Sequence, residues 1–129
     1  MIRRAFLLAG LLAATGLRHV DAASDLKVIY VGGWDCPPCT QWKNTEKARW
    51  LASPEYRRVT WVEIESPRLK EAYQARYWPA ELKSVLASLP RKNGTPRFLI
   101  VKDGHVLFNE FGTQSWAPLV AVLRKLLGE

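Results

Sequence analysis

The chain's only two cysteines lie in the stretch Trp34-Asp35-Cys36-Pro37-Pro38-Cys39. A disulfide between them encloses only two residues, and so short a loop removes little entropy from the unfolded chain. A structural zinc site takes about four ligands, and the 129 residues contain only two histidines besides this pair. The spacing therefore favours a redox-active pair. An inert bridge, a metal site and a redox sensor are the alternatives.

The residues on either side of the pair predict a strand before it and a helix after it. The apolar run over 26–31 suits a buried strand, and good helix formers occupy 40–52. Prolines are tolerated in the first turn of a helix. Cys36 would then be the N-cap, where the backbone N–H groups and the helix dipole stabilise a thiolate. Cys39 would lie one turn further in and be more buried.

This placement gives the two sulfurs different roles. Cys36 is the candidate nucleophile, which attacks a substrate disulfide and forms a mixed disulfide. Cys39 is the candidate resolving residue, which attacks that mixed disulfide and releases the substrate. The reverse sequence oxidises a substrate dithiol.

The remaining segments predict an α/β fold with a central mixed β-sheet of about four strands flanked by helices. A strand over 59–65 completes a parallel strand–helix–strand unit. Residues 68–89 favour helix but contain Pro79, so two helical pieces are expected there. Asp103-Gly104, between two β-rich runs, is typical of a hairpin, and a last helix follows from residue 115.

The first 22 residues have the pattern of a secretory signal peptide. Arg3 and Arg4 precede an uncharged run over 5–17 that is too short for a membrane helix of ~20 residues. We therefore expect cleavage after Ala22, with 23–129 as one domain in the periplasm or secreted. The paired arginines also fit a twin-arginine export signal. An ordinary secretion signal and an uncleaved anchor are the alternatives.

Composition excludes several classes of protein. Hydrophobic residues make up 48% and charged residues 24% of the chain, which is a globular balance. The net charge is +7, but the basic residues are scattered, whereas nucleic-acid-binding proteins concentrate them on one face or element. We expect no nucleic-acid partner and a monomer.

The chain over 25–128 resembles the thioredoxin family. The resemblance is carried by the cysteine stretch after the first predicted strand, by Gly94-Thr95-Pro96 before the third, and by the hairpin over 98–108. It implies a thioredoxin-like fold with a cis peptide bond before Pro96, beside Cys36. It further implies that Thr95 hydrogen-bonds an extended substrate segment and that Pro96 keeps a backbone donor away from the thiolate. The candidate substrate-binding residues are Trp34, Pro37, Thr95 and Pro96.

The sequence departs from the family pattern beneath the cysteines. The family has a buried aspartate six residues before the first cysteine, where it relays a proton to the resolving thiol. Tyr30 stands there in this chain, and a phenol with a pKa near ~10 is a poor base at neutral pH. Glu63, on the neighbouring strand, is the candidate replacement as a buried proton relay. Its alternative is a surface position paired with a lysine or arginine.

The segment before the expected cis-proline is longer than a thioredoxin core needs. We therefore predict a helical insertion over 66–94. Its aromatic residues Tyr73, Tyr77 and Trp78 either border the active-site face or pack the extra helix, and the second interpretation is favoured.

These features together predict an exported thiol–disulfide oxidoreductase that acts on protein substrates, most simply as a reductant, without cofactor or metal. A reductant in an oxidising compartment needs a membrane-bound electron donor. The alternatives are a disulfide oxidase or isomerase, and a non-catalytic binding or redox-sensing module. A metallochaperone is disfavoured because His105, the only histidine after the signal segment, lies in the distal hairpin.

Overall fold

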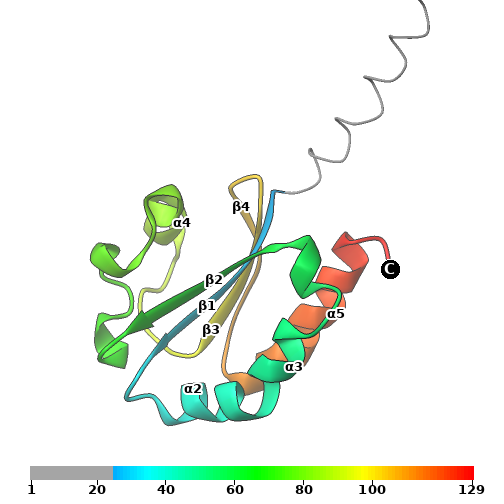
Figure 1. Cartoon of the computed structure of the whole chain (residues 1–129). Helices are drawn as coiled ribbons and strands as arrows, with labels where there is room; N and C mark the ends of the chain where they lie inside the picture. Colours follow the sequence, from blue (N-terminus) through cyan, green and yellow to red (C-terminus); the bar gives the residue numbers. More distant parts are fainter. Residues whose placement is uncertain (1–24) are drawn as a thin grey trace, which may run out of the picture.

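The computed structural model describes residues 25–129, which form a four-stranded sheet with helices on both faces (Figure 1). The predicted signal peptide over 1–22 and its cleavage point lie outside the described residues. Within the described part, no helix has the length and apolar character needed to cross a bilayer.

The sheet has the strand order β2-β1-β3-β4. β1 (Leu26–Gly33) pairs in parallel with β2 (Thr60–Ser66), because a helical crossover joins them. β3 (Arg97–Lys102) and β4 (His105–Phe111) are antiparallel to each other, and β3 is antiparallel to β1. The predicted α/β fold with a mixed four-stranded sheet is therefore confirmed.

The strands follow the sequence pattern that predicted them. β1 is central and buried on both faces apart from Lys27, which explains its continuous apolar run. Asp103 and Gly104 both have positive φ, 49° and 83°, as a tight hairpin with the right twist requires. The predicted hairpin between β3 and β4 is confirmed.

The cysteine stretch leads into a helical run that crosses one face of the sheet. It consists of α2 (Pro37–Trp42), a π-helical segment η2 (Lys43–Lys47) and α3 (Ala48–Leu51). The last helix, α5 (Trp116–Leu126), follows the short turn η7 (Thr113–Ser115) and covers the same face (Figure 1). Another short turn, η3 (Tyr56–Arg58), precedes β2.

The two faces of the sheet have separate cores. The face under α3 and α5 is aromatic and includes both cysteines; its other buried members include Tyr30, Trp42, Trp50, Phe98 and Trp116. The opposite face is mainly aliphatic; its buried members include Ile29, Val31, Ile64, Leu86 and Leu99. Because neighbouring strand residues point to opposite faces, β1 supplies Tyr30 to the first core and its two neighbours to the second.

The segment over 66–94 differs from the predicted pair of helical pieces. It forms three single 3-10 turns, η4 (Leu69–Glu71), η5 (Ala75–Tyr77) and η6 (Ala80–Leu82), followed by α4 (Lys83–Ser88). Pro79 holds the preceding residue in extended backbone and so prevents a continuous helix. The predicted break at Pro79 is therefore confirmed. The first predicted helical piece is wrong, because extended backbone at Gln74 divides it into two 3-10 turns. The second piece is confirmed as η6 followed by α4.

The insertion's aromatic residues pack its own core. Tyr73 and Trp78 are buried in the core beneath α4, and Tyr77 is half-buried against it. The Trp78 Nε1 group donates a hydrogen bond to the Ala72 carbonyl at 2.8 Å. The packing interpretation of these aromatics is confirmed.

Candidate active site

The two cysteines form a disulfide at the start of the helical run. Their Cα atoms lie 5.2 Å apart. Cys36 is the N-cap of α2, with φ −112° and ψ 104°, and its Sγ accepts a hydrogen bond from the Cys39 backbone N–H at 3.2 Å. The predicted N-cap position of Cys36 is therefore confirmed, with a backbone donor aimed at its sulfur.

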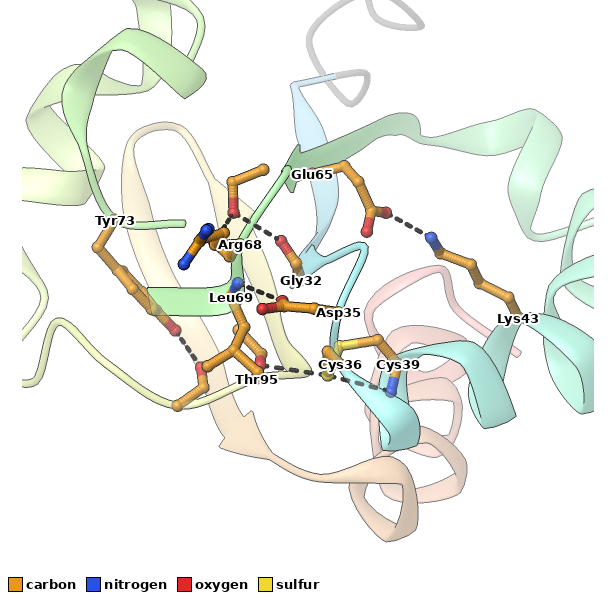
Figure 2. Close-up of a disulfide and its surroundings, with 12 residues drawn as sticks. Gly32, Asp35, Cys36, Cys39, Lys43, Glu65, Arg68, Leu69, Tyr73 and Thr95 are labelled. Atoms are coloured by element: carbon orange, nitrogen blue, oxygen red, sulfur yellow. Dashed lines mark hydrogen bonds and ion pairs between the residues drawn. A yellow bond between two sulfur atoms is a disulfide. The ribbon is translucent and has the colours of Figure 1, made fainter. Parts of the chain in front are cut away.

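A second donor reaches the same sulfur from the loop before β3. The Thr95 hydroxyl donates to Cys36 Sγ at 3.3 Å (Figure 2). The Thr95–Pro96 peptide bond is cis, and Pro96 is buried. This loop reaches the cysteines because Val31, near the end of β1, pairs with Arg97 at the start of β3. Cys36 thus has two hydrogen-bond donors from separate parts of the chain.

The surroundings of the disulfide are unevenly exposed. Cys36 is 1% exposed and Cys39 is fully buried, so the expected difference in burial between them is small. Trp34, by contrast, is 69% exposed, and Pro37 is also exposed. An incoming molecule therefore meets Trp34 and Pro37 before it reaches a sulfur.

The turn that precedes Cys36 is held against the insertion. The Trp34 N–H donates to the Ser66 carbonyl at 2.9 Å, and Asp35 Oδ1 accepts from the Leu69 N–H at 2.6 Å (Figure 2). The Lys43 ammonium lies 4.2 Å from the centre of the Trp34 ring, a cation–π distance. Trp34 is thus exposed yet fixed in place.

Tyr30 fills the space beneath the disulfide. Its ring is fully buried and stacks on Trp42, with the ring centres 5.2 Å apart. A Cβ atom built on Gly32 would lie 2.0 Å from the Tyr30 hydroxyl and 3.0 Å from Cys39 Sγ. The hydroxyl is therefore a near neighbour of the resolving sulfur, and Gly32 is needed because the hydroxyl occupies the place of a side chain.

The carboxylate near Tyr30 belongs to Glu65 and not to Glu63. Glu63 is exposed and forms an ion pair with Lys47 at 2.6 Å. The prediction of a buried Glu63 is therefore wrong, and the alternative, a surface glutamate paired with a lysine, is confirmed. Glu65 is two residues further along β2, opposite Gly32. Its side chain is 14% exposed, and its Oε1 accepts from Lys43 at 2.7 Å (Figure 2). Sequence reasoning missed Glu65 and Lys43; the register of β1 against β2 is the signal that finds them.

Several polar atoms near the disulfide are buried without a hydrogen-bond partner in the described part of the chain. They include the Tyr30 hydroxyl, Oε2 of Glu65 and Nε1 of Trp42. Burial, followed by the charge of Glu65, raises the pKa of Tyr30 well above its ordinary value. The phenol therefore stays protonated, and it can accept a proton only while it passes its own proton to another group.

Among residues 25–129, no cluster of three or more His, Cys, Asp or Glu side chains is placed to hold a metal ion. His105 begins β4 and is exposed.

No protein-family model matches the sequence, and no curated protein matches it. Among solved structures, the chain is similar to thioredoxin from Malassezia sympodialis, with a TM-score of 0.54, 15% identity, and 81% of this chain and 80% of that chain covered. Thioredoxin from Trypanosoma brucei brucei gives 0.52, 20% identity, and 86% and 83% coverage. Thioredoxin f from spinach chloroplast gives 0.52, 18% identity, and 88% and 87% coverage. The chain therefore has a thioredoxin-like fold.

The contact between Tyr30 and Gly32 gives a testable result. Gly32→Ala is expected to lower the free energy of unfolding by about 1–3 kcal/mol, because the added methyl overlaps a buried hydroxyl in a packed core. Urea denaturation measures the loss. The same substitution should cost less in a Tyr30→Phe background, where the hydroxyl is absent. An equal loss of unfolding free energy in the two backgrounds would contradict a close contact between Gly32 and the Tyr30 hydroxyl.

Proposed function

We propose that the chain is a thiol–disulfide oxidoreductase that exchanges the Cys36–Cys39 dithiol and disulfide with protein substrates. The observation that carries the proposal is the pair of donors on Cys36 Sγ, the Cys39 N–H and the Thr95 hydroxyl. Donors to sulfur stabilise a thiolate more than a thiol, so they favour Cys36 as the attacking and leaving sulfur. The exposed Trp34 and Pro37 supply the first contact surface for a protein partner.

In the reducing direction, the Cys36 thiolate attacks one sulfur of a substrate disulfide. A bond forms between Cys36 and that sulfur, and the other substrate sulfur leaves as a thiolate. Cys39 then loses its proton and attacks Cys36 Sγ, so the internal disulfide forms and the second substrate sulfur leaves. Two electrons pass to the substrate, and the protein ends oxidised.

The second attack requires an acceptor for the Cys39 proton. We propose Glu65, with Tyr30 as the intermediate group. The Tyr30 hydroxyl takes the proton from the Cys39 sulfur while its own proton moves to the Glu65 carboxylate. Lys43 binds the other carboxylate oxygen at 2.7 Å and so holds the Glu65 side chain in place. Glu63 stays outside this path because it is bound to Lys47.

We further propose that residues 1–22 direct export and that the couple works as a reductant supplied by a membrane-bound donor. The basic start and apolar run of this segment support export. The reduction potential decides the direction: we expect a value of about −270 mV, whereas a value of about −120 mV would indicate an oxidant. Equilibration with glutathione at defined ratios measures it.

Reaction with a small aromatic disulfide, dithiobis(nitrobenzoate), tests the exchange activity. The reduced chain should release thionitrobenzoate in two phases, the first from Cys36 and the second when Cys39 closes the disulfide. The first phase should titrate below the ~8.5 of a free thiol, because both donors favour the thiolate. Stopped-flow absorbance between acid and alkaline pH measures both phases.

Single-cysteine variants separate an enzyme from a binding module. Cys39→Ser should release one equivalent of thionitrobenzoate and, in a separate incubation, trap protein partners as stable mixed disulfides. Cys36→Ser should react more slowly, because the Cys39 N–H and the Thr95 hydroxyl both donate to Cys36 Sγ and favour that thiolate. Two results would favour the non-catalytic binding module over an enzyme. One is a first phase whose apparent pKa equals or exceeds that of a free thiol, and the other is a Cys36 thiol that the reagent does not modify.

The proton path predicts a difference between two glutamates on one strand face. Glu65→Gln should slow the second phase at neutral pH by at least about tenfold, as loss of a proton acceptor does, and the rate should recover as pH rises. Glu63→Gln is the matched control and should stay within about twofold. The same stopped-flow traces give both values, and indistinguishable pH profiles would remove Glu65 from the path.

A further inference from the structure

Arg97 is a fully buried cation at the start of β3. No carboxylate within the described residues forms an ion pair with it. Its guanidinium instead donates to neutral acceptors: Nε to the Asn109 side-chain oxygen at 2.7 Å, and Nη1 to the backbone carbonyl of Arg91. The rings of Tyr73 and Phe111 lie against it, with their centres 5.5 Å and 4.5 Å away.

A buried guanidinium often stabilises a core less well than an apolar side chain does. Its desolvation costs several kcal/mol, and an apolar side chain of similar volume is often as stable or more stable. What a guanidinium adds is geometry, because its donors lie in one rigid plane and fix the acceptors that they bind. Arg97 therefore fixes the position of the Arg91 backbone, where the loop before β3 begins.

The other end of the same loop is fixed by the insertion. The Tyr73 hydroxyl donates to the Gly94 carbonyl at 2.6 Å. Gly94 has φ 96° and packs so closely on Phe111 that a Cβ atom would lie 2.8 Å from its ring. The loop over 91–94 is thus held at its first residue by Arg97 and at its last by Tyr73. We call these two residues the loop brace.

The residue after the braced loop is Thr95, whose hydroxyl donates to Cys36 Sγ (Figure 2). Figure 2 also shows the Tyr73 hydroxyl approaching this loop from the side opposite the disulfide. Tyr73 comes from the insertion and Arg97 from the strand that follows the loop. Both act on Thr95 through the backbone, and neither hydrogen-bonds a sulfur.

We propose that the loop brace positions Thr95 for an extended segment of a protein substrate, so that Tyr73 and Arg97 are positioning residues of the exchange reaction. The inference rests on the proposed function. It also explains what the insertion does, because the added segment holds the loop that a bound substrate chain would pair with. A substrate that adds a strand relies on backbone groups in fixed positions, whereas a small disulfide needs access to sulfur alone.

The test compares two reagents that release the same thionitrobenzoate. One is dithiobis(nitrobenzoate), and the other is an unstructured seven-residue peptide with its single cysteine linked to thionitrobenzoate. The measured quantity is the ratio of their second-order rate constants with the reduced protein. Tyr73→Phe deletes one hydroxyl and keeps the buried ring. It should lower the peptide-to-small-reagent ratio by at least about threefold, the effect of one lost hydrogen bond.

Tyr77→Phe is the matched control. Tyr77 lies in the same insertion, and its hydroxyl donates to Glu71 and not to the loop. This variant should keep the wild-type ratio. Arg97→Met should lower the ratio further than Tyr73→Phe, with circular dichroism and urea denaturation reporting whether it folds. If it does not fold, Tyr73→Phe alone decides.

An unchanged ratio in folded Tyr73→Phe, or an equal fall in Tyr77→Phe, would overturn the loop brace. Failure of the proposed function has a different signature, because the wild-type protein would then react with the small reagent no faster than a free thiol. The two failures are therefore distinguishable from one set of rate constants.

Discussion

The hydrogen bond from the Thr95 hydroxyl to Cys36 Sγ joins two parts of the chain that are 59 residues apart. It exists only because the antiparallel pairing of β1 with β3 brings the end of one strand to the start of the other. The Cys39 N–H reaches the same sulfur through local helix geometry, three residues along the chain. The sheet therefore supplies what distinguishes this pair from any closely spaced cysteines: a second donor, a shielded location and a loop beside the sulfur.

Much of the fold was predictable because its signals are local. The apolar run of β1 and the Asp103-Gly104 turn each determine an element without reference to the rest of the chain. The glutamate beneath the disulfide was not predictable in the same way. Glu63 and Glu65 point to the same face of β2, and only the register against β1 separates them. Glu63 lies opposite the bulky Tyr30 and turns to Lys47, whereas Glu65 lies opposite Gly32.

The insertion shows a different limit of sequence reasoning. Its composition favours helix, but extended backbone at Gln74 divides its first part into single 3-10 turns, and Pro79 ends that part. The hydrogen bond from Tyr73 to Gly94 spans 21 residues and leaves no periodic pattern in the sequence. Burial of Tyr73 was predictable from its aromatic ring, whereas the target of its hydroxyl was not. Arg97 is likewise buried without a carboxylate partner among residues 25–129, which a sequence does not reveal because arginine usually indicates a surface.

The aromatic core has an optical consequence. Trp42, Trp50 and Trp116 share one buried cluster with the disulfide, and a disulfide accepts an electron readily from a nearby excited indole. Emission from these side chains should therefore be quenched while the sulfur–sulfur bond is intact and brighten when it opens. Tryptophan emission would then report the oxidation state of the cysteine pair in real time, without an added label.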